Sequence, residues 1–351
     1  MRVTFLLPFI NHRGGSQLVI DVANHLTDLG DQVWVVWPTR LKLLPWPLNE
    51  IEYLWRGPWK TLTCRWYTSR AAVRARPSLR ECYIPEGDVV VATAWQTARW
   101  AASYGPSRGR KVYYIFEPEI HKDEEGCVAT YRLPFDRRIS ISEWTSEALR
   151  SRYGTRIDRV TPVGLEEGRF PERQAPPSPS VRHVGMLHES STKKGFEDGY
   201  QAFLAVREKH PDLRLHLLGV SRRPPAFPDF VVPHFRVSHE HKVRLFHTTD
   251  VWLAPSLQEG WGLVPMEAMA CGNAVVTTRV GGTPYFAVDG QTALVVDPGD
   301  RRGLAAALER LVVDTELRHR LIRQGTVEAR RLKMRDTATL FRDALTELLQ
   351  E

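Results

Sequence analysis

The sequence has few cysteines, and they lie far apart. Its 351 residues include four of them, Cys64, Cys82, Cys127 and Cys271. Their spacing fits neither a disulfide framework nor a zinc site, so we expect a chain that stays reduced in the cytoplasm. No apolar run reaches the length that crosses a bilayer. The apolar stretch after Met1 is too short for a signal peptide and ends at Asn11 without a small-residue cleavage site, which favours a first buried strand.

Two motifs of nucleotide-binding enzymes are also absent. There is no G-x-G-x-x-G run, which argues against the common dinucleotide fingerprint. There is no Asp-x-Asp pair to hold a metal ion, so we expect no metal and no other cofactor. The hydrophobic and charged fractions are ordinary for a soluble protein, and the length suits two domains. The net charge of +7 favours an acidic partner without naming one.

What the sequence does contain is a strand, a glycine loop and a helix in direct succession over residues 250–272. The strand runs from Asp250 to Ala254, and the loop carries Gly260 and Gly262. The helix begins at about Val264 and ends before Gly272. Free backbone N–H groups and the positive end of the helix dipole make such a corner an anion site, and glycines let a phosphate approach closely.

Two carboxylates, Glu259 and Glu267, bracket this loop. On a single helix they would lie roughly 12 Å apart along the axis, too far to share a proton or a metal ion. A carboxylate can accept two hydrogen bonds from vicinal hydroxyls, as the acidic residue of dinucleotide sites does with ribose. A diphosphate on the N–H groups with a sugar on either side describes a nucleotide sugar. A tight turn in an ordinary Rossmann-like domain is the alternative.

The same stretch resembles the retaining glycosyltransferases of family 4, which carry an E-x7-E signature. The resemblance extends over four segments, residues 256–263, 267–272, 275–278 and 281–282. It implies an α/β protein of the GT-B fold, with two Rossmann-like, doubly wound parallel-sheet domains that face a central cleft. It also implies transfer with retention from a nucleotide diphosphate sugar to an acceptor hydroxyl on a glycan, a lipid or a small molecule.

The resemblance assigns roles residue by residue in the second half of the chain. Glu259 would contact the donor sugar and Glu267 the ribose, and Lys194 would contact the diphosphate. The loop residues that offer backbone N–H groups are Gly260, Trp261, Gly262 and Leu263. Gly219 ends the strand whose following loop would hold the base. The family has an arginine where this chain has Met186, and the replacing charge is expected from Lys193 or from Arg222 and Arg223.

In the first half, Gly14 and Gly15 lie at the first strand-to-helix turn, where the resemblance places a donor-phosphate or acceptor contact. A plain tight turn is the alternative for them. The strand ending at Phe116 often carries a histidine in the family; here Glu117 follows, with His121 four residues later. Glu117 is our first candidate for a catalytic residue in this half and His121 the second, although charged loops are usually just solvated.

Residues 40–80 are basic and aromatic. They contain nine lysines and arginines against two glutamates, with tryptophans and tyrosines between them. This mixture suits peripheral contact with an anionic membrane at the inner face, a phosphorylated acceptor or stacking on sugar rings. It could also bind single-stranded nucleic acid, or form a solvated rim with its aromatics in the core. We expect no nucleic-acid partner.

The domain prediction follows from composition. Four prolines in residues 171–180 indicate an extended linker between an acceptor domain, 1–170, and a donor domain, 181–325. A helical pattern over 326–351 is expected to cross back to the first domain. Rival functions are a nucleotide-sugar epimerase or hydrolase on the same fold, and a basic nucleic-acid-binding protein.

Overall fold

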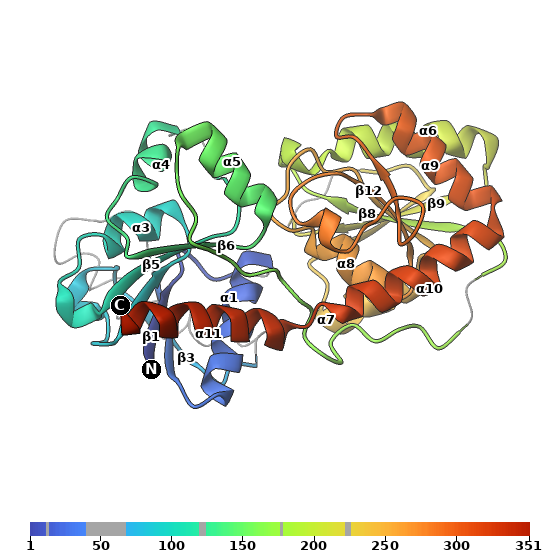
Figure 1. Cartoon of the computed structure of the whole chain (residues 1–351). Helices are drawn as coiled ribbons and strands as arrows, with labels where there is room; N and C mark the ends of the chain where they lie inside the picture. Colours follow the sequence, from blue (N-terminus) through green and yellow to red (C-terminus); the bar gives the residue numbers. More distant parts are fainter. Residues whose placement is uncertain (12–13, 40–67, 119–123, 176–177, 222–225) are drawn as a thin grey trace. The chain divides into compact units, whose positions relative to one another are not determined.

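The computed structural model describes residues 1–11, 14–39, 68–118, 124–175, 178–221 and 226–351. Internal contacts divide the chain into two compact units (Figure 1). The first comprises Met1–Val163 together with Met334–Glu351, and the second comprises Gly164–Lys333. Within the described residues, no helix is long and apolar enough to cross a membrane.

The first unit is built on a parallel sheet of seven strands in the order β3-β2-β1-β4-β5-β6-β7. The strands are β1 (Arg2–Leu6), β2 (Gln32–Pro38), β3 (Ala72–Arg76), β4 (Val89–Ala92), β5 (Arg110–Ile115), β6 (Arg137–Ser140) and β7 (Arg159–Val160). The central strands carry mainly buried apolar residues, because both faces of a parallel sheet are covered by helices. The predicted first strand is confirmed as β1.

The helices of the first unit are α1 (Gly14–Asp28), α3 (Trp95–Ala101), α4 (Glu124–Thr130), α5 (Glu143–Tyr153) and α11 (Met334–Gln350). The C-terminal helix α11 lies along α1 (Figure 1). Its Phe341 ring packs 5.6 Å from Phe5 and 4.7 Å from Tyr114. Its Arg342 pairs with buried Asp31 at 2.7 Å. Burial alone would raise the pKa of Asp31, but hydrogen bonds from Arg342 and the N-terminal ammonium lower it.

The helical pattern predicted over 326–351 falls on two helices rather than one. Residues 326–331 are the last turns of α10 (Thr315–Arg331) in the second unit, and α11 begins at Met334. Leu332 between them is extended, with φ −84° and ψ 103°. Its carbonyl accepts a hydrogen bond from Leu165 N at 2.8 Å, and this contact fixes the break.

The second unit has a parallel sheet of six strands in the order β10-β9-β8-β11-β12-β13. The strands are β8 (His183–His188), β9 (Arg214–Gly219), β10 (Val231–Phe235), β11 (Val251–Ala254), β12 (Ala274–Thr278) and β13 (Leu294–Val296). The strand order reverses between β8 and β11, as it does between β1 and β4 in the first unit. Ligands of such sheets bind beyond the carboxyl ends of the strands at this reversal.

The other helices of the second unit are α6 (Phe196–Lys209), α7 (His239–Thr248), α8 (Leu263–Ala270) and α9 (Arg301–Val313). Helix α6 packs beside α9, and α8 packs beside α10 (Figure 1). An apolar core of valines, leucines and phenylalanines joins the sheet to α6 and α9. The two doubly wound parallel sheets confirm the predicted fold class.

The proline-rich segment 171–180 lies inside the second unit rather than at its boundary, which falls after Val163. Arg173 explains its attachment. The Arg173 guanidinium donates to Thr249 O at 2.6 Å, and Arg173 N donates to Cys271 O at 3.2 Å. These bonds tie the segment to the ends of α7 and α8.

Four histidines form a hydrogen-bonded row that crosses strands β8, β9 and β10 and ends on α7. The ring nitrogens of His183 and His216 lie 2.9 Å apart, those of His216 and His234 3.0 Å, and those of His234 and His241 3.0 Å. Each N···N contact holds one proton, and the two terminal nitrogens hold one more if all rings are neutral. The row can therefore take up one extra proton and keep all three N···N contacts, whereas a second extra proton would break one of them.

This row is expected to make the second unit less stable in acid. Burial, together with the charges of His183 and His234, lowers the pKa of His216 to about 4. Because the folded-state value lies below the ordinary 6.5, stability is complete above that pH and is lost as the pH falls toward 4. At pH 5 the full pKa shift would lower the free energy of unfolding by roughly 2 kcal/mol, and screening by water reduces this loss to about 1 kcal/mol.

Urea unfolding at pH 7 and pH 5 measures this effect. The His216→Leu variant is expected to be less stable at pH 7, since its neighbours lose a partner, but to lose less between the two pH values than the natural chain. An equal loss in both proteins would remove the row as the source of the acid sensitivity.

Candidate active site

The site begins where β11 ends at Ala254 and the chain enters the loop before α8. Gly262 caps the helix in the left-handed region, with φ +95°, and α8 starts at Leu263. Gly272, with φ +92°, follows the helix and lets the chain turn away. The predicted strand, glycine loop and helix are therefore confirmed. The first N–H groups of a helix have no partner within it, so those at the start of α8 are available to an anion.

The indole of Trp261 anchors the loop from inside. Its side chain is buried, and Nε1 donates to Met266 Sδ at 3.3 Å. The ring packs so closely on Gly282 that a Cβ there would lie 2.1 Å from it. Gly282 N also donates to Gly260 O at 3.1 Å. The Gly281–Gly282 pair thus holds the shape of the loop, and Trp261 can offer a ligand its backbone but not its ring.

Lys194 and Glu259, both predicted as catalytic, are brought together. Lys194 Nζ donates to Glu259 Oε2 at 2.8 Å, and Ser256 Oγ donates to Glu259 Oε1 at 2.8 Å. The Glu259 side chain is 14% exposed and that of Lys194 23% exposed, so the pair is partly shielded from water. The ammonium and the carboxylate neutralise each other. Each becomes available to a ligand only when another group balances the charge of its partner.

A close approach of two backbones sets this geometry. Lys194 ends a short 3-10 turn, Thr192–Lys194, and Gly195 follows with φ +60°. A Cβ on Gly195 would lie 1.9 Å from Pro255 O. Lys193 O accepts hydrogen bonds from the backbone N–H groups of residues 257 and 258 at 2.7 and 3.1 Å. The turn that carries Lys194 is therefore fixed to the glutamate loop.

Gly195→Ala is expected to destabilise the chain by more than about 2 kcal/mol, because it combines a left-handed backbone with a clash. Gly290→Ala is the matched control. Gly290 has a similar φ of +69° but nothing within 4 Å of its Cβ position, so about 1 kcal/mol is expected. Urea unfolding of both variants measures the difference, and equal losses would contradict the close approach.

Glu267 lies one turn into α8 and is buried, with 7% of its surface exposed. The ammonium of Lys242, on α7, pairs with its Oε2. Lys242 Nζ also lies 5.4 Å from the centre of the Phe170 ring and 5.7 Å from that of Phe246. Nothing in the local sequence pattern marked Lys242 as part of the site.

An aromatic cluster at the carboxyl ends of β8, β9 and β10 is a further feature that the sequence did not indicate. The His188 ring lies 4.5 Å from that of Phe196 and 5.4 Å from that of Phe235, and burial lowers the pKa of His188. Gly219 faces the same cluster, because a Cβ there would lie 2.4 Å from the Phe235 ring. The loop after Gly219 includes Arg222 and Arg223, which lie outside the described residues.

Met186, at the position of the family arginine, is fully buried. Its sulfur packs on α6, 2.7 Å from where a Cβ on Gly199 would lie. Cys271, at the end of α8, is also buried, and burial together with the charge of Glu267 raises the pKa of its thiol to about 12. Met186 therefore serves the core, and Cys271 is a neutral thiol rather than a nucleophile.

The predicted residues of the first unit lie at the carboxyl edge of its sheet. Gly15 is in the first turn of α1, and its Cβ position lies 3.4 Å from the ring of Phe116, directly after β5. Glu117 follows Phe116, so it lies close to the same turn. His121 and most of the basic aromatic stretch, residues 40–67, lie outside the described residues.

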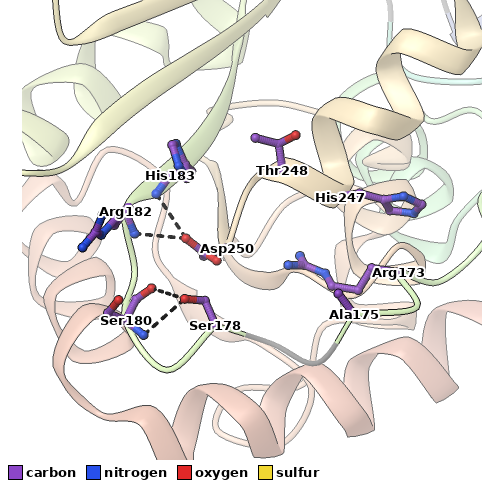
Figure 2. A pocket seen from close by; sticks show the side chains of 9 residues that line it. All are labelled: Arg173, Ala175, Ser178, Ser180, Arg182, His183, His247, Thr248 and Asp250. Atoms are coloured by element: carbon purple, nitrogen blue, oxygen red, sulfur yellow. Dashed lines mark hydrogen bonds between the residues drawn. The ribbon is translucent and has the colours of Figure 1, made fainter.

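A pocket of about 440 Å³ lies elsewhere in the second unit (Figure 2). It is found at the amino ends of β8 and β11, between Arg173, His183 and Asp250. Asp250 Oδ2 accepts hydrogen bonds from the backbone N–H groups of Arg182 and His183 at 3.0 and 3.1 Å (Figure 2). Because ligands of such sheets bind at the carboxyl ends, we do not assign this pocket to the active site.

The sequence of the second unit matches a known protein family. Residues 178–314 match the family described as Glycosyl transferases group 1. This segment lies within the second unit and spans less than half of the chain. The predicted resemblance to a glycosyltransferase family is confirmed for it.

Individual relatives extend the comparison. D-inositol 3-phosphate glycosyltransferase of Paenarthrobacter aurescens is 30% identical over 261 residues, which cover 66% of this chain and 63% of the relative. Glycogen synthase of Mycobacterium tuberculosis is 26% identical over 190 residues, which cover 51% and 46%. The matched part of this chain thus spans less than two thirds of each of these relatives.

Solved structures agree on the fold. The complex of Anabaena HepE with UDP-glucose superposes with a TM-score of 0.77 at 17% identity, covering 99% of this chain and 100% of that one. Sucrose-phosphate synthase from Thermosynechococcus elongatus has a TM-score of 0.74 at 16% identity and covers 99% of each chain. The chain therefore has the GT-B type of architecture.

Proposed function

We propose that the chain transfers a sugar, with retention of configuration, from a nucleoside diphosphate sugar to an acceptor hydroxyl. The observation that carries the proposal is the corner formed by β11, the glycine loop and α8, where Glu259 and Glu267 lie on either side of free helix N–H groups. The P. aurescens relative is named as a glycosyltransferase, and the HepE structure contains UDP-glucose.

In this proposal the diphosphate binds at the start of α8, and Lys194 balances the charge that develops as the glycosidic bond breaks. Glu259 accepts hydrogen bonds from the donor sugar, and Glu267 accepts them from the ribose. The acceptor oxygen attacks from the face on which the diphosphate leaves, so no carboxylate has to act as a covalent nucleophile. We propose that the reaction needs no metal ion, and activity retained in excess EDTA would test this.

The direct test is the release of nucleoside diphosphate from the glucose conjugates of uridine, guanosine and adenosine diphosphates. Each donor is incubated without acceptor and with a panel of free sugars, glucans, inositol phosphate and lipid extract. We expect release that depends on one acceptor class, and NMR of the product should show the anomeric configuration of the donor. Equal release with and without every acceptor would favour the hydrolase or epimerase instead.

The contribution of the first unit to this function is also a proposal. Gly15 and Glu117 lie at the carboxyl edge of the sheet, where doubly wound folds bind ligands, so we assign the acceptor to this unit. Residues 40–80 are proposed to hold the acceptor or an anionic membrane surface on which it is presented. Binding of the chain to vesicles with and without anionic lipid tests the second possibility.

A further inference from the structure

We propose that Lys242 is a positioning residue that holds Glu267 oriented for the ribose of the donor. This inference rests on the proposed function, because it names how one carboxylate of that site is prepared. The structure pairs the Lys242 ammonium with Glu267 Oε2. The two residues come from different helices, α7 and α8, and lie 25 positions apart in the sequence.

The burial of Glu267 is the first reason. Its side chain is 10% exposed, and an isolated carboxylate is costly to bury unless a counter-charge or hydrogen bonds balance it. Lys242 supplies the counter-charge on Oε2. A ribose that donates to Glu267 therefore meets a carboxylate whose charge is already balanced on one side.

The surroundings of the ammonium are the second reason. Lys242 Nζ lies within 6 Å of the centres of two aromatic rings, those of Phe170 and Phe246, where cations are attracted to the ring faces. Both rings are buried, and Phe246 packs edge-on against Trp252 at 4.9 Å. The two rings restrict the positions that the ammonium can take, so it is directed toward Glu267 before any ligand binds.

The start of α7 fixes the lysine from the backbone side. Ser238 caps the helix, and its Oγ accepts a hydrogen bond from His241 N at 3.2 Å. Lys242 N donates to Ser238 O at 3.0 Å, so the lysine lies in the first hydrogen-bonded turn. Any shift of α7 therefore changes the position of the ammonium relative to Glu267, which couples this helix to nucleotide binding.

Other charged or titratable groups near Glu267 do not replace Lys242. Cys271, at the end of the same helix, stays neutral because burial and the charge of Glu267 oppose its ionisation. Arg330, on α10, is turned to a backbone oxygen, with Nε donating to Ala270 O at 3.3 Å. Arg173 donates to Thr249 O at 2.6 Å. Among the described residues, Lys242 is therefore the cation that pairs with Glu267.

Isothermal titration of Lys242→Met and Lys242→Arg tests the inference. The probes are the diphosphates of uridine, guanosine and adenosine and their 2′,3′-dideoxy counterparts. For the ribonucleotide that the natural chain binds, Lys242→Met is expected to weaken binding about tenfold. Lys242→Arg, which keeps the cation, should bind within about twofold of the natural chain.

The dideoxy counterpart is the internal control, because a ligand without ribose hydroxyls should bind the natural chain and Lys242→Met equally. Lys209→Met is the matched variant, since Lys209 forms an exposed pair with Glu309 at 2.9 Å in the same unit. If Lys242→Met does not fold, Lys242→Gln provides the same readouts.

The outcomes separate the inference from the function on which it rests. Binding by Lys242→Met within twofold of the natural chain, or an equal loss for the dideoxy ligand, would overturn the positioning role alone. A natural chain that binds none of the three nucleotides would overturn the proposed function, and the inference with it.

Discussion

Replacing Glu259 by glutamine is expected to lower sugar transfer at least about 100-fold while leaving nucleotide affinity undiminished. The loss follows because Glu259 is the acidic group of the glycine loop that we assign to the donor sugar, and removing one pre-organised polar contact in an active site typically has an effect of this size. Turnover and nucleotide binding must be measured on the same preparation.

The contact between Glu259 and Lys194 explains why nucleotide affinity should not fall. In the unliganded chain, the Lys194 ammonium is 2.8 Å from Glu259 and is partly neutralised by it. With glutamine in place, the full charge of Lys194 is available to the diphosphate, so nucleoside diphosphate should bind as tightly as before or more tightly. Glu309→Gln, which breaks an exposed lysine pair in the same unit, should change neither quantity. Parallel losses of turnover and affinity would show that Glu259 does not act on the sugar.

Replacing Glu267 by glutamine should weaken nucleotide binding, unlike the replacement of Glu259. Hydrogen bonds to a charged acceptor are worth about 1.5–3 kcal/mol each, so the loss of the carboxylate is expected to weaken ribonucleoside diphosphate binding about 100-fold. Binding of the 2′,3′-dideoxy nucleotide should be weak in the natural chain and should not weaken further in the variant. Calorimetric titration with both ligands measures this.

A second consequence concerns Lys242. Glutamine at position 267 leaves the Lys242 ammonium without its carboxylate partner in a partly buried position. The double variant Glu267→Gln with Lys242→Met should therefore be at least as stable as Glu267→Gln alone, since neither charge then remains. If Glu267→Gln bound ribo- and dideoxynucleotides with unchanged affinities, the assignment of Glu267 to the ribose would be wrong.

The local part of this site could be predicted from the sequence. The strand, the glycine loop, Pro265 in the first turn and Gly272 after the helix are signals that each depend on a few neighbouring residues. The structure has the same elements, with α8 one residue longer at its start than predicted. Local signals of this kind also indicated β1.

The contacts that give the site its chemistry could not be predicted in this way. Lys194 and Glu259 are 65 residues apart, and their pairing depends on Gly195 packing against Pro255. Lys242 is one lysine among many on helix surfaces, and nothing in its local pattern shows which carboxylate it meets. Such pairs follow from the strand order, which places β8 next to β11.

Two features of the fold could not be predicted from the sequence for a different reason. Strand β10 contains Pro233, which argues against a central strand, but β10 is at the edge of its sheet, where proline is tolerated. The apolar pattern continues without interruption from α10 into α11, so the sequence indicated one helix. The break at Leu332 depends on a hydrogen bond to Leu165, far away in the sequence.

The central claim is that the N-terminus of α8 binds the diphosphate of the donor, with Glu259 on the side of the sugar and Glu267 on the side of the ribose. A crystal structure of the chain with a bound nucleoside diphosphate sugar tests it most directly. We predict phosphate oxygens within hydrogen-bond distance of the backbone N–H groups of residues 262–264, and ribose hydroxyls on Glu267. A ligand bound at another edge of the sheet, or in the pocket beside Asp250, would contradict the account.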